Sequence, residues 1–190
     1  MKALKDRILK EGKYLGAGIL KVDHFINHQV DPLLMDACGR EFARLFKDSG
    51  ATRILTAEIS GIAPALSTGY HMGLPIVYAR KSKPITMPDT VYLTVAPSHT
   101  RGRPVELIVS PEFLGKGERV LIIDDFLASG ATIQGLIRLL EASGAELAGI
   151  GTLIEKSFEG GREALTGTGV PIESLAIITR MDDEGIFFDD

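Results

Sequence analysis

Two adjacent acidic residues, Asp124 and Asp125, follow an apolar run and precede a loop of small residues. The run from Val120 to Ile123 is typical of a strand buried on both faces, and open α/β sheets bind ligands at the carboxyl ends of such strands. The loop, called the phosphate loop below, consists of Ala128, Ser129, Gly130, Ala131 and Thr132. Its small side chains let backbone N–H groups close on a phosphate at the start of the helix that follows. Carboxylates for hydroxyl groups beside a loop for a phosphate imply a phosphorylated sugar as the ligand.

The strand, the acid pair and the loop together resemble the phosphoribosyl diphosphate (PRPP) motif of type I phosphoribosyltransferases. The resemblance implies that Asp124 and Asp125 hold the ribose hydroxyls during catalysis and that the phosphate loop binds PRPP. A nucleoside triphosphate loop is excluded, because the chain has no G-x-x-x-x-G-K-[ST] motif. The alternative for the motif alone is a buried strand, a solvated acidic pair and a helix cap.

Two further turns follow expected strands. Ser60 and Gly61 form a short turn, called the pyrophosphate turn below, in which glycine permits a close approach of the backbone to a pyrophosphate. The resemblance makes this turn the pyrophosphate-binding loop. Arg80-Lys81-Ser82-Lys83, the basic loop, suits a polyanion, although a solvated loop is the alternative. The resemblance places a basic residue of this loop on the pyrophosphate of a neighbouring subunit. We expect Lys81 to make that contact, with Arg80 second, in a homodimer with composite sites.

The whole chain is similar to the bacterial xanthine phosphoribosyltransferases, a family of purine salvage enzymes. The segments that carry the resemblance are MKALKDRILKEG, ILKVDHFINHQVDPLLM, SGIAPA, YARKSK, VLIIDDFLASGAT and AGIGTLIEKSF. The resemblance implies transfer of 5-phosphoribosyl from PRPP to xanthine, giving XMP and diphosphate, with Mg²⁺ entering through PRPP and no metal bound by the protein alone. It also implies that Leu20, Asn27 and Lys156 contact the base, Lys156 at the 6-oxo group. Whether Phe126 or Phe158 stacks on the base is left open.

Composition restricts the class of protein. A chain of 190 residues with 45% hydrophobic residues is long enough for one domain with its own core. A net charge of −4 offers no broad basic surface for nucleic acid or anionic lipid. A single cysteine, Cys38, cannot form an internal disulfide, and we see neither a signal peptide nor a membrane-spanning stretch. We therefore expect a cytoplasmic protein.

The pattern of elements predicts an α/β domain covering residues 1–190. Helices are expected over 2–11, from Asp31, after Gly61 to about Met72, and around 133–140; strands are expected over 52–57, 75–79, 91–96, 104–110, 119–123, 147–154 and 172–178, the last of the chain. Strands that alternate with helices indicate a mainly parallel sheet. The resemblance implies the type I phosphoribosyltransferase fold, a five-stranded core sheet flanked by helices. Residues 1–30 would contribute a helix and a small hood over the base; the hood is defined here as residues 12–30.

Residues 82–110 look like a mobile hairpin that could close over the site, and a plain exposed hairpin is the equal alternative. Two alternatives for function also remain. One is a transferase for hypoxanthine, guanine or a pyrimidine, which the acid pair and the phosphate loop cannot distinguish. The other is a non-catalytic PRPP-sensing regulator, which would need a DNA-binding module or a basic patch.

Overall fold

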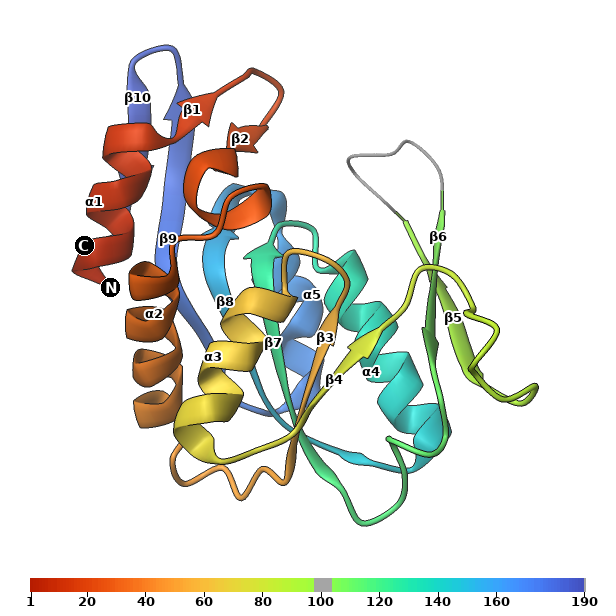
Figure 1. Cartoon of the computed structure of the whole chain (residues 1–190). Helices are drawn as coiled ribbons and strands as arrows, with labels where there is room; N and C mark the ends of the chain where they lie inside the picture. Colours follow the sequence, from red (N-terminus) through yellow and green to blue (C-terminus); the bar gives the residue numbers. More distant parts are fainter. Residues whose placement is uncertain (98–103, 190) are drawn as a thin grey trace.

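The computed structural model describes residues 1–97 and 104–189. Its central sheet has the strand order β10-β9-β8-β7-β3-β4 (Figure 1). These strands are β3 (Arg53–Ala57), β4 (Ile76–Ala79), β7 (Arg119–Leu127), β8 (Glu146–Lys156), β9 (Ile172–Asp182) and β10 (Gly185–Phe188). Strands β4, β3, β7, β8 and β9 are parallel, and β10 pairs antiparallel with β9. The predicted five-stranded parallel core is confirmed.

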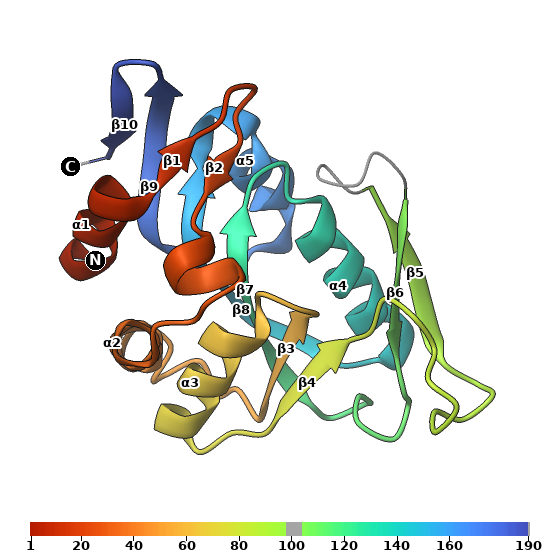
Figure 2. The same cartoon turned by 45° about the horizontal axis from the view of Figure 1, so that its top comes forward.

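Helices cover both faces of this sheet (Figures 1 and 2). They are α1 (Lys2–Glu11), α2 (Pro32–Leu45), α3 (Ile62–Met72), α4 (Ala131–Ser143) and the short α5 (Gly161–Leu165). Leu121 and Ile123 of β7 are buried in the same apolar cluster as residues of α1, α2 and α3. Val120 and Ile122 are buried in a second cluster with residues of α4. The uninterrupted apolar run of β7 therefore reflects burial on both faces, as predicted.

Local sequence signals set the start of α2. The Asp31 carboxylate accepts hydrogen bonds from the backbone N–H groups of Leu33 and Leu34, both at 3.0 Å, and Pro32 occupies the first turn. The buried side chains of this helix include Cys38. Burial raises the pKa of the Cys38 thiol to about 12, so the thiol stays protonated and serves packing.

The structure corrects two strand boundaries. Strand β7 does not end at Ile123 but continues to Leu127, because its pairing with β8 continues to Leu127 opposite Glu155. The acid pair therefore lies within the strand rather than after it. The strand predicted over residues 172–178 extends to Asp182, and it is not the last strand, because β10 folds back on it. The sheet thus has six strands among the described residues.

The hood contains more regular structure than its mixed sequence signals indicated. Strands β1 (Lys13–Tyr14) and β2 (Leu20–Lys21) form a small antiparallel pair, and a π-helix covers Asp23–Asn27. Between β1 and β2 the chain turns through Gly16, Ala17 and Gly18, with φ of +86°, +48° and +74°. Figures 1 and 2 show the hood over the end of the sheet to which β7, β8 and β9 point.

The hairpin predicted from residues 91–96 and 104–110 is present. It consists of β5 (Tyr92–Ala96) and β6 (Val105–Val109), paired antiparallel beside α4. Residues 98–103, which include Ser98, His99, Thr100, Arg101 and Arg103, lie outside the described residues. Closure of the segment over the site therefore stays a prediction. No helix among the described residues is long and apolar enough to cross a membrane.

Candidate active site

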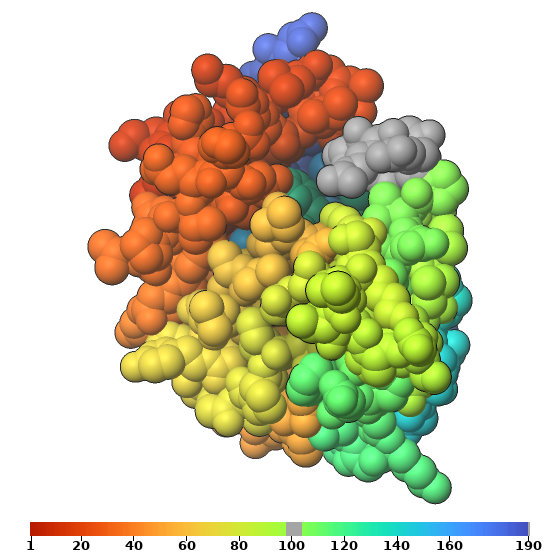
Figure 3. All heavy atoms as spheres, turned by 45° about the vertical axis from the view of Figure 1, so that its right-hand side comes forward, coloured from red at the N-terminus to blue at the C-terminus, as the bar shows by residue number. Residues whose placement is uncertain are grey.

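One edge of the sheet collects the predicted site residues. Strands β3, β4, β7 and β8 are parallel neighbours, so their carboxyl ends lie along the same edge. The pyrophosphate turn follows β3, the basic loop follows β4, the phosphate loop follows β7, and Lys156 ends β8. Figure 3 shows the surface hollowed between the hood, in orange, and the yellow-green segments, with atoms of later segments on the floor. This hollow is the candidate active site.

The acid pair lies near the carboxyl end of β7, at this edge of the sheet. Asp124 is 4% exposed and Asp125 is half-buried, and the Asp125 backbone N–H donates to Asp124 Oδ1 at 3.0 Å. Burial raises the pKa of Asp124 well above its usual range, and the neighbouring Asp125 charge raises it further. Burial also raises the pKa of Asp125. The pair is therefore suited to receive hydrogen-bond donors or positive charge from a ligand.

Gly61 and Thr56 complete the wall beside Asp124. A Cβ added to Gly61 would lie 2.2 Å from Thr56 Oγ1 and 2.4 Å from Asp124 Oδ1, so the pyrophosphate turn packs directly on the acid pair. Ser60, half-buried, lies in the same turn, and a cis peptide bond between Glu58 and Ile59 precedes the turn. Thr56 is fully buried, and its hydroxyl has no hydrogen-bond partner among the described residues. Our sequence analysis missed Thr56, because one threonine in an apolar strand carries no signal of its own.

The basic loop is joined to the pyrophosphate turn through Glu58. The Lys81 backbone N–H donates to Glu58 Oε1 at 2.6 Å, and Arg80 Nε forms an ion pair with Glu58 Oε2 at 3.2 Å. The Lys81 ammonium acts on the acid pair of its own chain, where it opposes the rise of both aspartate pKa values. Lys81 thus lies within electrostatic reach of the site in a single chain.

The phosphate loop is shorter than predicted. Helix α4 begins at Ala131, so Ala131 and Thr132 belong to its first turn, and Gly130 is its N-cap with φ +79°. Glycine is the residue that adopts this left-handed conformation readily. The first N–H groups of a helix have no partners within it, so the loop and the first turn present donors and a positive dipole end. Ala128 and Ser129 complete the loop, both half-buried.

Lys156 links the end of β8 to the hood. Its Nζ donates to the carbonyl oxygen of Gly18 and to Glu159 Oε1, both at 2.8 Å, and lies 5.7 Å from the centre of the Phe126 ring. Phe126 is half-buried against the core, whereas Phe158 is 45% exposed. Our sequence analysis also missed Glu159, whose carboxylate restrains the lysine.

The two other predicted base contacts differ in exposure. Leu20 is buried in the core cluster that includes α1 and α2, so its side chain helps to hold the hood on the domain. Asn27 is exposed at the end of the π-helix. The structure therefore brings Lys156 to the hood, and it places Leu20 and Asn27 within the hood itself.

The residues present fit a Mg²⁺ ion that arrives with its ligand. No cluster of three or more His, Cys, Asp or Glu side chains suited to a metal occurs in the described part of the chain. Mg²⁺ commonly binds through one or two carboxylates together with substrate phosphates, and the acid pair supplies such carboxylates beside the phosphate loop.

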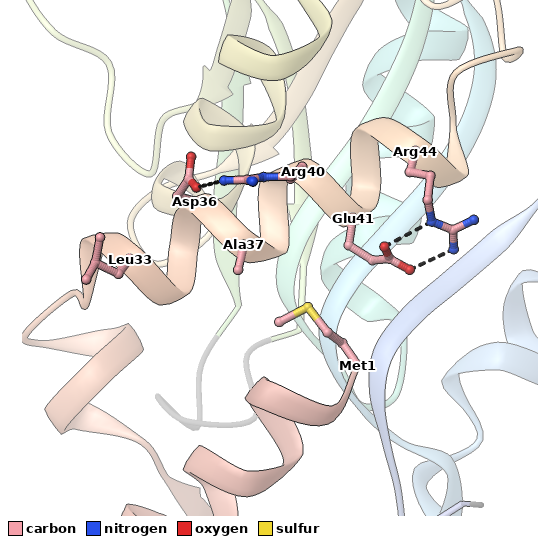
Figure 4. Close-up of a pocket in the computed structure, with 7 residues that line it drawn as sticks. All are labelled: Met1, Leu33, Asp36, Ala37, Arg40, Glu41 and Arg44. Carbon is pink, nitrogen blue, oxygen red and sulfur yellow. Dashed lines mark hydrogen bonds and ion pairs between the residues drawn. The ribbon is translucent and has the colours of Figure 1, made fainter.

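A second concavity, of about 530 Å³, lies on α2 beside the N-terminus (Figure 4). Its charged side chains are already paired, Arg40 with Asp36 and Arg44 with Glu41. It is lined by Met1, Leu33, Asp36, Ala37, Arg40, Glu41 and Arg44, and it contains none of the predicted site residues.

Comparison with known proteins finds a matching family model and similar sequences. Residues 33–164 match the family model described as phosphoribosyl transferase domain. The chain is 47% identical over 188 residues to a xanthine phosphoribosyltransferase of Lactobacillus delbrueckii subsp. bulgaricus, covering 99% of this chain and 100% of the relative. It is 46% identical over 188 residues to that of Listeria monocytogenes, covering 99% and 98%.

Solved structures share the fold. The adenine phosphoribosyltransferase of Trypanosoma brucei, solved in complex with AMP, pyrophosphate and ribose-5-phosphate, superposes with a TM-score of 0.78 at 20% identity, covering 96% of this chain and 82% of that one. The Giardia lamblia enzyme complexed with 9-deazaadenine gives 0.74 at 23%, covering 92% and 96%.

Proposed function

The chain belongs to the phosphoribosyltransferase family, and on that premise we propose that it transfers the 5-phosphoribosyl group of PRPP to xanthine, giving XMP and diphosphate. The observation that carries this proposal is the 47% identity, over almost the full length of both chains, to a xanthine phosphoribosyltransferase. The geometry supports it, because the acid pair, the phosphate loop and Lys156 occupy one edge of the sheet.

The acid pair acts at the sugar. Asp124 and Asp125 accept hydrogen bonds from the ribose hydroxyls, which add donors to the backbone N–H groups that these carboxylates already accept from. Glycosyl transfer passes through an oxocarbenium-like state, and the negative charge of the pair stabilises the positive charge that develops there. The phosphate loop holds the 5′-phosphate, so that the anomeric carbon and the base nitrogen are kept in line.

The departing diphosphate needs positive charge and backbone donors. The Ser60-Gly61 turn offers its backbone, and Lys81 offers an ammonium within electrostatic reach of the acid pair. Mg²⁺ bound with PRPP would neutralise part of the diphosphate charge.

The base is bound between β8 and the hood. A lysine ammonium has three donors, and Gly18 and Glu159 take two from Lys156, which leaves one for the 6-oxo group. Asn27, exposed in the hood, offers an amide nitrogen to the second oxo group of xanthine. Leu20 packs against the ring of the base. Phe158, 45% exposed, and Phe126, half-buried beside Lys156, are the two candidates for stacking on the base.

We also propose that the protein is a homodimer. Large apolar side chains are exposed on α3, on β4 and on the loops after β3 and β4: Ile59, Leu66, Tyr70, Tyr78 and Ile85. Exposed apolar patches of this kind mark protein interfaces. Burying this face against a second copy would bring the basic loop of each chain near the partner, as a composite site requires. A cytoplasmic location fits the single Cys38, which is buried.

A product assay tests the function. The purified protein is incubated with PRPP and Mg²⁺ and with xanthine, guanine, hypoxanthine, adenine or uracil, and nucleotides are separated by chromatography. We expect the highest kcat/KM with xanthine, and we expect Asn27→Ala to reduce it most for xanthine. A higher value with guanine or hypoxanthine would replace the substrate and keep the reaction. PRPP binding without turnover of any base would favour the sensing regulator.

A further inference from the structure

Helix α5 follows β8 and begins against the phosphate loop. A Cβ added to its first residue, Gly161, would lie 2.2 Å from the carbonyl oxygen of Ala128, 2.9 Å from the backbone nitrogen of Gly130 and 2.7 Å from Leu127 Cδ1. Two of these atoms belong to the backbone of the loop and cannot rotate away. Glycine at position 161 therefore lets two backbone segments approach more closely than any side chain would allow.

The contact is reciprocal. A Cβ added to Gly130 would lie 3.2 Å from the Gly161 carbonyl oxygen and 3.4 Å from its Cα. A hydrogen bond also joins α4 to α5: Gln134 Nε2 donates to the Ala164 carbonyl oxygen at 3.4 Å. The backbone of the phosphate loop thus rests on the backbone at the start of α5.

The next residue fixes the start of α5 to the sheet. Arg162 binds both oxygens of Glu155 through Nε at 2.8 Å and Nη2 at 2.6 Å, and its Nη1 donates to the carbonyl oxygen of Ile172 at 3.0 Å. Glu155 is only 1% exposed, and it also accepts from Ser174 Oγ at 2.6 Å. A two-pronged ion pair on a buried carboxylate sets position and direction together.

The network joins the two ends of the proposed nucleotide site. Glu155 and Lys156 are consecutive at the end of β8. Glu155 is bound to Arg162 at the start of α5, which supports the phosphate loop, while Lys156 is bound to the hood. The end of β8 is therefore bonded both to the start of α5, which packs on the phosphate loop, and to the hood.

We propose that Gly161 and the Arg162–Glu155 ion pair are positioning residues, which hold the phosphate loop in the conformation that accepts the 5′-phosphate of PRPP. They touch no substrate atom and act through the backbone of residues 128–130. This inference rests on the proposed function, because it assigns the loop to that phosphate.

Calorimetric binding of ribose 5-phosphate to Gly161→Ala tests the inference without turnover. Misplacing a positioning element by about 1 Å can reduce function by about 10²-fold, and we expect affinity to fall by about that factor. In steady-state assays the KM for PRPP rises, while the KM for xanthine changes little. Gly167→Ala is the matched control, because a Cβ at this glycine of the same region meets nothing within 4 Å; we expect it to bind as the unaltered protein does.

The outcomes are distinguishable. If the unaltered protein does not bind ribose 5-phosphate, the proposed function fails. If it binds and a folded Gly161→Ala variant binds equally well, or loses xanthine binding to the same extent, the positioning role is wrong. Should Gly161→Ala fail to fold, as judged by circular dichroism, Arg162→Lys decides. That variant keeps the charge and loses the two-pronged contact, so unchanged ribose 5-phosphate binding overturns the inference and weakened binding supports it.

Discussion

We expect Asp124→Asn to make this protein more stable and less active. Asp124 is 4% exposed beside a second carboxylate, and burial raises its pKa well above that of an aspartate in the unfolded chain. At neutral pH the folded state therefore disfavours the ionised form of Asp124, which lowers the stability of the protein. The asparagine variant removes this charge while keeping the shape of the side chain and an oxygen that can accept from the Asp125 N–H. The same substitution removes a negative charge from the proposed reaction centre.

The linkage between pKa and stability gives the direction of the effect. Because the pKa of Asp124 is raised well above its usual range, we expect the free energy of unfolding, and with it Tm, to increase at pH 8 when the charge is removed. Turnover falls by about 10²–10³ as the charge facing the transition state is lost.

The pH dependence of stability tests the sign of this effect. A carboxyl with a raised native pKa contributes stability that is fully present below its unfolded pKa, about 3.9, and is lost as pH rises through its native pKa. The Tm difference between Asp124→Asn and the unaltered protein should therefore be small near pH 4 and grow toward pH 8, by differential scanning fluorimetry without ligand. Asp183→Asn, at an exposed position in the turn before β10, is the matched control for an aspartate that loses its charge at the surface. A variant less stable than the unaltered protein at pH 8, or a difference independent of pH, would refute the reasoning.

Three further outcomes test other parts of the site. Gly61→Ala places a methyl group on Asp124 and Thr56, and we expect a loss of PRPP turnover of about 10²-fold; Gly115→Ala, with nothing within 4 Å, should have no effect. Lys81→Ala and Asp125→Asn should each have low transferase activity. If Lys81 serves the partner's site, mixing the two variants with subunit exchange should give activity above that of either variant alone, and no gain assigns Lys81 to the site of its own chain. Lys156→Ala should raise the KM of xanthine, guanine and hypoxanthine together by about tenfold or more, as the loss of a charged hydrogen bond predicts, and equal KM values would remove this lysine from the base site.

Much of the fold could be predicted because its signals are local. The Asp31-Pro32 start of α2 and the apolar run of β7 each state their own structure, and the parallel core follows from the alternation of strands and helices. The end of β7 could not be predicted in this way. Two carboxylates look like the end of a strand, yet pairing with β8 continues the strand to Leu127. Strand β10 depends similarly on tertiary pairing with β9.

The residues of the candidate site could likewise be predicted only where their signals are local. The acid pair and the phosphate loop are contiguous in sequence, so their spacing was enough to predict them together. The surroundings of Thr56 and Gly161 come from residues far along the chain: a Cβ at Gly61 would meet both Thr56 and Asp124, and a Cβ at Gly161 would meet Ala128. Such contacts carry no local pattern, since a lone threonine or glycine is compatible with many environments.

The bond between Lys156 and the hood has a consequence for how substrate preference can change. Lys156 holds the hood through the carbonyl oxygen of Gly18, an atom that every residue possesses. Side chains of the hood, such as Asn27, can therefore be replaced without releasing this attachment. The buried side chains of the hood, Leu20, Val22, Phe25 and Ile26, belong to the core and would have to stay. Exchanging only the exposed residues of 19–30 between relatives should therefore transfer base preference while the attachment of the hood is kept.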